Sequence, residues 1–185
     1  VEDRILGLLI FTAFIPVMLL IAGLIKWKMG GPVLFKQYRH GIDGKCFRIY
    51  KFRTMSNHQA KYTQQATHGD PRITPLGALL RRTSLDELPQ LYNVLQGRMS
   101  LVGPRPHALD HNQYYKGVIQ NYMQRHRVKP GMTGWAQVNG YRGNTDTLEQ
   151  MQKRVEVDLY YIDSWSLGFD LKILAMTLTR GFINR

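Results

Sequence analysis

Residues 5–25 read ILGLLIFTAFIPVMLLIAGLI and contain no ionisable side chain. This is about the length that an α-helix needs to cross the hydrocarbon core of a bilayer. A cleaved signal peptide would need a basic leader and a small-residue cleavage site, whereas acidic residues precede this stretch and Lys26-Trp27-Lys28 follow it. The sequence therefore predicts a membrane anchor at residues 1–29, followed by one domain at residues 30–185.

Pro16 lies in the middle of the apolar stretch, where a missing N–H and a bulky ring bend or interrupt a helix. Two geometries follow: a kinked spanning helix with its ends on opposite sides, or a re-entrant hairpin that returns to the same side. Hydropathy alone does not separate them. Basic residues crowd the exit and place the following domain on the cytoplasmic side. They are Lys26, Lys28, Lys36 and Arg39.

The net charge of +12 predicts an anionic partner, for which nucleic acid, acidic lipid head groups and phosphorylated small molecules are candidates. No nucleic-acid recognition motif is visible, and an apolar anchor is out of place in such a protein. Cys46 is the only cysteine, so an intrachain disulfide is excluded and a reducing compartment is expected. Because the chain begins at Val1 rather than methionine, we also expect a missing upstream region.

Patterning beyond the anchor predicts an α+β fold with helices around a small sheet. Alternating apolar and polar residues over 46–52 predict a half-buried strand. Residues 55–70 are polar and without periodicity, which is typical of a surface loop. The stripe of the last helix suits either the membrane interface or the protein core. The further elements expected are helices at 76–80, 88–95, 111–126, 154–162 and 171–178, and a strand at 99–102.

Residues 81–89 read RRTSLDELP, so two arginines precede the adjacent carboxylates of Asp86 and Glu87. In one interpretation Ser84 and Glu87 form a capping box; in the other the helix starts later, with Pro89 in its first turn. Both place the carboxylates at a helix N-terminus, where free N–H groups attract phosphate. A divalent cation would screen the like charges. Paired acids beside arginines suit phosphoryl transfer.

Residues 100–106 read SLVGPRP, an apolar strand that runs into Arg105 held between two prolines. Such an arginine suits bidentate phosphate recognition, although a rigid surface turn with a solvated arginine has the same pattern. Residues 129–140 are punctuated by glycine and offer Gln137 and Asn139 for hydrogen bonding to a nucleotide or sugar. An ordinary turn beside a strand is the alternative. The histidines receive no role, because none has a convincing metal-ligand partner.

Four collinear motifs, at residues 51–55, 86–91, 100–106 and 129–140, follow the proline-broken apolar stretch. In order and spacing they resemble the bacterial sugar transferase family of monotopic phosphoglycosyl transferases, over nearly the whole chain. Residues 140–154 are most similar to the branch that loads glucose phosphate onto undecaprenyl phosphate to begin exopolysaccharide synthesis.

The resemblance implies a UDP-sugar donor, an undecaprenyl phosphate acceptor and Mg²⁺ as cofactor. Asp86 would attack the sugar-linked phosphorus and release UMP, and the lipid phosphate would then attack the sugar-phosphoryl aspartate. Glu87 is either a metal partner of Asp86 or the base that assists the lipid phosphate. The family carries its apolar segment as a re-entrant hairpin, with Pro16 as the candidate break. The remaining substrate-binding candidates are Lys51, Arg53, Arg81, Arg105, Gln137, Asn139 and Asp158.

Such an enzyme would lie at the cytoplasmic face of the bacterial inner membrane, in contact with membrane lipids. A noncatalytic scaffold that holds acidic lipids or partner proteins is the main rival, and it predicts no dependence on Asp86. A basic nucleic-acid-binding module predicts salt-sensitive oligonucleotide binding, and a glycosyltransferase that cleaves the sugar–phosphate bond would release UDP instead of UMP. The sequence leaves open the donor sugar and whether the chain forms a homo-oligomer.

Overall fold

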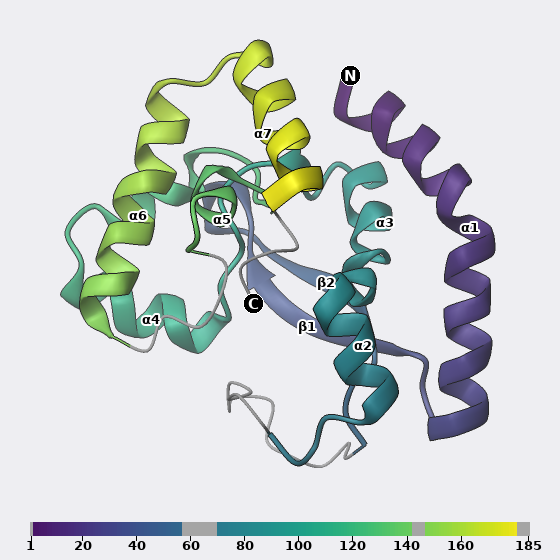
Figure 1. Ribbon diagram of the computed structural model, residues 1–185. Coiled ribbons are helices and arrows are strands. Elements are labelled where there is room, and N and C mark those ends of the chain that lie inside the picture. The colour runs from purple at the N-terminus through teal and green to yellow at the C-terminus, as the bar shows by residue number, and fades with distance from the viewer. Residues whose placement is uncertain (1, 57–69, 142–146, 181–185) are drawn as a thin grey trace. The chain divides into compact units, whose positions relative to one another are not determined.

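The computed structural model describes residues 2–56, 70–141 and 147–180 (Figure 1). The fold is α+β, as predicted, with small two-stranded sheets. The chain forms two compact units, each with its own apolar cluster. Unit 1 comprises Val1–Gln37 and Arg48–Gly97, and unit 2 comprises Tyr38–Phe47 and Arg98–Arg185.

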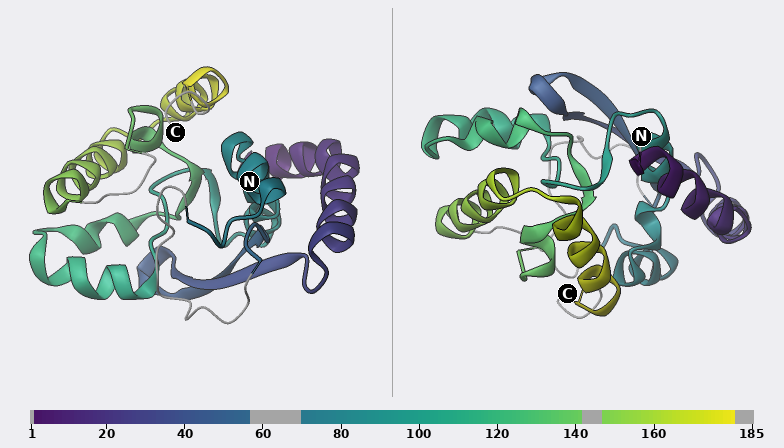
Figure 2. Two further views of the ribbon diagram at one scale, coloured as in Figure 1. Left: turned by 60° about the horizontal axis from the view of Figure 1, so that its bottom comes forward. Right: turned by 90° about the horizontal axis from the view of Figure 1, so that it is seen from above.

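Helix α1, Glu2–Met29, is the long apolar element of unit 1. Within the described residues it is the one helix long and apolar enough to cross a membrane. It continues through Pro16 as a single helix and bends near its middle (Figures 1 and 2). A bend is what a proline causes when it removes one hydrogen bond and crowds the preceding turn. The structure thus has a bent, continuous helix at Pro16, and the break expected for a hairpin is not confirmed.

Both halves of α1 pack against unit 1. In the second half, Ile21 and Ile25 are 5% and 0% exposed and join Phe52 and Leu80 in an apolar cluster. Burial of one such side chain stabilises a fold by about 1.5 to 3 kcal/mol. In the first half, Gly7 faces Val94 of α3, Gln90–Leu95, so closely that even a methyl group would touch it. Most side chains in the middle of α1 remain exposed.

Strands β1, Leu34–His40, and β2, Cys46–Phe52, form a hairpin closed by the turn η1, Ile42–Gly44. Asp43 and Gly44 both have positive φ, of 54° and 69°, which suits an aspartate and a glycine in a tight turn. Along β2, Phe47, Ile49 and Phe52 are buried. The strand predicted at 46–52 is confirmed with these bounds.

Helix α2, Pro75–Thr83, begins with proline in its first turn, and the Thr74 hydroxyl accepts a hydrogen bond from the Gly77 amide at 3.0 Å. It ends at Ser84, whose φ of 59° turns the chain into η2, Leu85–Glu87. Ser84 makes no side-chain cap, so the capping-box interpretation is wrong. The later helix start is confirmed, because Pro89 is the N-cap of α3.

In unit 2, β3, Ser100–Val102, pairs in parallel with β4, Gly131–Thr133. Glycines are required here, because a side chain at Gly131 or Gly134 would overlap the backbone of Gly103. The glycine-punctuated segment therefore uses these glycines for close backbone packing. It continues into the short helix α5, Trp135–Val138.

The remaining elements of unit 2 are helical. The single helix predicted at 111–126 is wrong: α4, Leu109–Val118, is separated from η3, Tyr122–Arg127, by Asn121 with a φ of 60°. Helix α6, Leu148–Asp163, starts earlier than predicted and contributes Met151 and Val155 to the apolar cluster of the unit. Helix α7, Leu167–Arg180, is also confirmed. Most of the polar segment expected at 55–70 lies outside the described residues, as do 142–146.

Candidate active site

The acidic pair lies on η2 in unit 1. Asp86 and Glu87 are 7% and 5% exposed, which is rare for carboxylates without a function or a partner. The turn is fixed from both sides, because Leu85 and Leu88 pack against the apolar cluster that contains Ile25. A short rigid turn between two apolar contacts thus holds the two carboxylates.

Lys51 on β2 provides the cation for this pair. Its Nζ donates to Oε1 of Glu87 at 2.9 Å, and the two side chains are 20% and 7% exposed. The partners are far apart in the sequence and meet because β2 and η2 belong to the same unit. Lys51, Asp86 and Glu87 therefore form a compact charged site, and a partly exposed ammonium group is suited to exchange its carboxylate for a phosphate.

Arg53 lies two residues further along β2 and is 5% exposed. Its Nη2 donates to the carbonyl oxygen of Met29 at 2.8 Å and also to that of Gly30. These carbonyls belong to the end of α1, where helix carbonyls lack partners in the helix. The arginine predicted to bind substrate thus also fixes the end of the membrane helix to the strand that carries Lys51.

Arg81 is half-buried in the last turn of α2, directly before the turn to η2. No described contact joins it to either acid. It acts on Asp70, whose pKa falls to about 2, chiefly through hydrogen bonds from Arg72, with the positive charge of Arg81 as a smaller cause. Asp70 and Arg72 form a bidentate ion pair in the segment just before α2.

Arg105 follows β3 in unit 2 and is half-buried. Its carbonyl oxygen accepts a hydrogen bond from Nη2 of Arg125 at 2.9 Å. Arg125 in turn donates through Nε to Oδ2 of Asp158 at 2.8 Å, and both side chains of this ion pair are 3% exposed. The structure therefore brings Arg105 and Asp158 together through Arg125, which is not among the predicted site residues.

Burial governs the charges around Arg125. It raises the pKa of the Asp158 carboxyl, while Arg125 and then Arg154 oppose that rise. Burial and then the charge of Arg125 hold the pKa of His107 well below its usual range, so this histidine is neutral. Burial also raises the pKa of Tyr122 to about 12.

The two predicted amide ligands lie on or next to α5 and brace their own loop. Gln137 is 5% exposed, and its Nε2 donates to the carbonyl of Met132 at 3.1 Å. Asn139 is exposed and donates to the carbonyl of Trp135 at 2.8 Å. The Oε1 atom of Gln137 is buried without a hydrogen-bond partner among the described residues.

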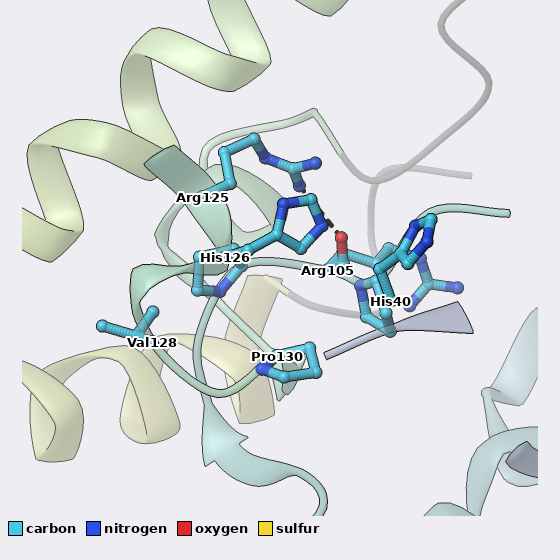
Figure 3. A pocket seen from close by; sticks show the side chains of 8 residues that line it. His40, Arg105, Arg125, His126, Val128 and Pro130 are labelled. Atoms are coloured by element: carbon cyan, nitrogen blue, oxygen red, sulfur yellow. Dashed lines mark hydrogen bonds between the residues drawn. The ribbon is translucent and has the colours of Figure 1, made fainter. Parts of the chain in front are cut away.

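A small hollow beside Arg105 is lined by prolines, histidines and arginines (Figure 3). Its volume of about 10 Å³ is about the space for one water molecule. It is therefore too small for a sugar or a nucleotide. The lining residues are His40, Pro104, Arg105, Pro106, Arg125, His126, Val128 and Pro130.

The acidic pair fits a magnesium ion by the chemistry of its donors. Mg²⁺ is usually held by one or two carboxylates together with substrate phosphates, and Asp86 and Glu87 offer two carboxylates on one turn. Within the described ranges no group of three or more His, Cys, Asp and Glu side chains could hold a metal ion. The residues thus suit a metal that arrives with, or is completed by, a phosphorylated ligand.

Comparison with known proteins gives the class. The model of the family described as bacterial sugar transferase matches residues 1–184. The chain therefore belongs to the bacterial sugar transferase family. Membership, together with the apolar α1, indicates association with a membrane.

Several curated relatives are similar over nearly the whole chain. An Escherichia coli K12 protein named UDP-glucose:undecaprenyl-phosphate glucose-1-phosphate transferase is 55% identical over 100% of this chain and 40% of its own length. A Komagataeibacter xylinus protein named undecaprenyl-phosphate glucose phosphotransferase is 44% identical over 99% and 35%. An Aeromonas hydrophila protein named for transfer of N-acetylgalactosamine phosphate is 42% identical over 95% and 41%. The chain thus spans about two fifths of the length of these relatives.

Proposed function

We propose that this chain transfers a sugar 1-phosphate, glucose 1-phosphate in the first instance, from a UDP-sugar to undecaprenyl phosphate, and so begins exopolysaccharide synthesis. One observation carries the proposal: in a member of the bacterial sugar transferase family, a buried pair of adjacent carboxylates lies beside the ammonium group of Lys51. The glucose relatives at 55% and 44% identity support the choice of sugar.

In the proposed reaction, a carboxylate oxygen of Asp86 attacks the sugar-linked phosphorus of the UDP-sugar. The bond from that phosphorus to the bridging oxygen breaks, and UMP leaves with the electron pair. An oxygen of the lipid phosphate then attacks the same phosphorus, which releases Asp86 and yields undecaprenyl-diphosphate-sugar. The rigid turn η2 holds Asp86 in place for both displacements.

The neighbours of Asp86 supply positive charge and a second carboxylate. Lys51 faces Glu87 and can turn to the phosphate oxygens as negative charge develops on them. Glu87 either shares a metal with Asp86 or takes a proton from the lipid phosphate. Asp86 and Glu87 would hold Mg²⁺, which would supply positive charge to neutralise the phosphates.

The membrane segment is proposed to be re-entrant, with both ends of α1 at the cytoplasmic face of the bacterial inner membrane. The packing of both halves of α1 within unit 1 supports this geometry, because Gly7 and Ile25 each contact residues of the same unit. In a spanning helix the two ends would lie on opposite sides. With the re-entrant geometry, a lipid phosphate could reach the site without withdrawing its tail from the bilayer.

The topology is tested by labelling single cysteines introduced near residues 4 and 28 in intact and permeabilised cells, after the exposed Cys46 is replaced by serine. We expect both positions to be labelled only after the inner membrane is opened. Labelling of the two positions from opposite sides contradicts the re-entrant helix. Pro16→Ala is expected to straighten α1 and reduce activity.

The activity is tested by UMP release from UDP-glucose in nanodiscs with undecaprenyl phosphate and Mg²⁺. Asp86→Asn is expected to reduce release by at least about 1,000-fold, because it removes the nucleophile. The matched control is Asp163→Asn, an exposed acid at the end of α6. UDP as the product would mean that a different bond is cleaved, and absence of any nucleotide product with all UDP-sugars would favour the scaffold.

A further inference from the structure

The segment from Pro104 to Pro106 is held by its carbonyl oxygens. Two prolines remove two backbone donors, so the segment is unsuited to a sheet ladder. Each of its three successive carbonyls instead accepts a hydrogen bond from another part of unit 2. The donors are the Gly131 amide to Pro104 at 2.9 Å, Arg125 Nη2 to Arg105 at 2.9 Å, and Arg39 Nη1 to Pro106 at 3.5 Å.

The central donor, Arg125, is itself fixed on every side. Its Nε and Nη2 atoms lie 2.8 and 2.7 Å from Oδ2 of Asp158. Its Nη1 lies 3.0 Å from Nδ1 of His107, which must accept because a guanidinium only donates. The planar fork thus reaches a carboxylate, an imidazole and a carbonyl together, a geometry that lysine does not reproduce.

Further buried polar groups surround the imidazole. Nδ1 of His107 lies 2.6 Å from the hydroxyl of Tyr122, and that hydroxyl lies 2.7 Å from Oδ1 of Asn112. Asn112 continues the network to Nδ1 of His40 at 2.7 Å. His107, Tyr122 and Asn112 are all buried, so these groups leave Arg125 little freedom to move.

These contacts also exclude a ligand role for Arg125 and Asp158. Both side chains are 3% exposed, and the hollow that Arg125 helps to line has space for about one water molecule. Figure 3 shows that Arg125 lies on one side of the hollow, with a dashed line to the carbonyl of Arg105. A substrate phosphate would therefore meet the side chain of Arg105 and not the ion pair behind its backbone.

We propose that Arg125 and Asp158, here called the Arg125 clamp, are positioning residues that fix the backbone of Arg105 so that its guanidinium is presented to the diphosphate of the nucleotide sugar. The proposal rests on the proposed function for the identity of the ligand. The clamp itself rests only on contacts within unit 2. It assigns Asp158 a role through Arg125 and Arg105, in place of a direct contact with substrate.

The first test is a double-mutant cycle on UMP release by the chain in nanodiscs. Asp158→Asn is expected to raise the KM for UDP-glucose by about tenfold and to change kcat by less than about threefold, because a misplaced Arg105 weakens binding in ground and transition states alike. In an Arg105→Gln background the same substitution should leave KM unchanged. An equal loss in both backgrounds overturns the proposal. The exposed control is Asp163→Asn.

A second variant guards against simple misfolding. Arg125→Lys keeps a buried cation for Asp158 but cannot also reach the Arg105 carbonyl and His107. We expect it to reproduce the rise in KM, with thermal unfolding within a few degrees of the wild type. If Arg125→Lys has the wild-type KM, the carbonyl contact is irrelevant and the proposal falls.

Hydrogen–deuterium exchange tests the clamp independently of activity. In Asp158→Asn, amides of the segment 105–108 should exchange at least about tenfold faster than in the wild type, while those of β4 and α6 stay within about twofold. Unchanged exchange, or an even increase over unit 2, overturns the clamp. If the wild type releases no UMP, the proposed function fails while this measurement still decides whether Asp158 fixes the Arg105 backbone.

Discussion

Units 1 and 2 hold their charged residues in different surroundings. In unit 1 the acidic pair sits on an apolar base, and Glu87 pairs with Lys51, whose side chain is 20% exposed. In unit 2, Arg125 and Asp158 are both 3% exposed and belong to a longer polar network. A partly exposed cation such as Lys51 can exchange partners when a ligand arrives, whereas a pair with both members buried and fully coordinated keeps its geometry.

This difference predicts which substitutions affect stability and which affect activity. Removal of one partner of a buried ion pair leaves an uncompensated charge in a low-dielectric interior. The loss of a cation near the surface costs little stability, because water replaces it. Charge removal in unit 2 should therefore reduce stability in addition to any effect on substrate binding, whereas in unit 1 it should mainly reduce the rate of the reaction.

The largest effect is expected from Asp158→Ala, which should reduce the free energy of unfolding by about 4 kcal/mol because Arg125 stays buried without a carboxylate. Urea titration in detergent measures it. Asp163→Ala is the matched control on the same helix: its oxygen lies 3.9 Å from Arg127, with both side chains more than half exposed. If Asp158→Ala lost no more stability than Asp163→Ala, the proposed contrast between the two units would be wrong.

The next effect comes from the apolar base of unit 1. Ile25→Ala is expected to cost about 3 kcal/mol, because the side chain is 0% exposed and its removal leaves a cavity against Phe52 and Leu80. Leu20→Ala, on the same helix at 65% exposure, should change the urea midpoint in detergent very little. Equal effects of the two variants would show that α1 is only an anchor.

Lys51→Met should reduce UMP release by about 100-fold, because a positive charge beside the acidic pair is lost. Its effect on the free energy of unfolding should stay within about 1 kcal/mol. Lys45→Met is the control, since its Nζ lies 3.9 Å from Asp43 and both side chains are largely exposed. If Lys51→Met lost as much stability as Asp158→Ala, the prediction that Lys51 can exchange its carboxylate for a ligand would be contradicted.

The smallest effect is a pH dependence in unit 2. Burial, and then the charge of Arg125, lower the pKa of His126 to about 4 from 6.5. The unfolded chain therefore binds more protons than the folded chain between these values, so stability falls as pH falls from about 6.5 to 4. At pH 5.5 the loss should be about 1 kcal/mol after allowance for partial exposure.

His126→Gln should lessen this dependence in urea titrations at pH 7.5 and 5.5. Two other groups face His126. The ring of His40 makes an edge contact, with the ring centroids 5.8 Å apart, and the carbonyl of Met123 accepts a hydrogen bond from the His126 ring. His107 contributes with the same sign, so part of the dependence should persist. A wild type that is equally stable at both pH values would contradict the burial of these rings.

Local pattern was sufficient for much of the fold. The apolar run, the alternation over 46–52 and the proline at 89 identify α1, β2 and the start of α3, because each signal acts within a few residues. The prediction of one helix at 111–126 is wrong at Asn121. This asparagine adopts the left-handed conformation immediately before η3 and so interrupts the helix. Nothing in the periodicity marks that residue.

The site divides in the same way. Asp86 and Glu87 stand out as adjacent acids, and the motifs select Lys51 and Arg105 without their partners. Arg125 was missed because its burial depends on contacts with residues far away in the chain. One signal was available: Asp158 lies three residues after Val155, on the buried face of α6, and an acid on such a face needs a cation.

The end of α1 has a consequence for exchange of membrane helices between proteins. Arg53 binds the carbonyls of Met29 and Gly30, and the glycines at 30 and 31 turn the chain with φ of 58° and 54°. If a foreign helix replaced α1 and were one residue longer or shorter at this end, its last turn would rotate away from Arg53. The residue in place of Ile25 would then leave the apolar cluster. Chimaeras that join at Met29 should preserve that register, and deletion of the helix should yield an aggregating remainder and not a soluble enzyme.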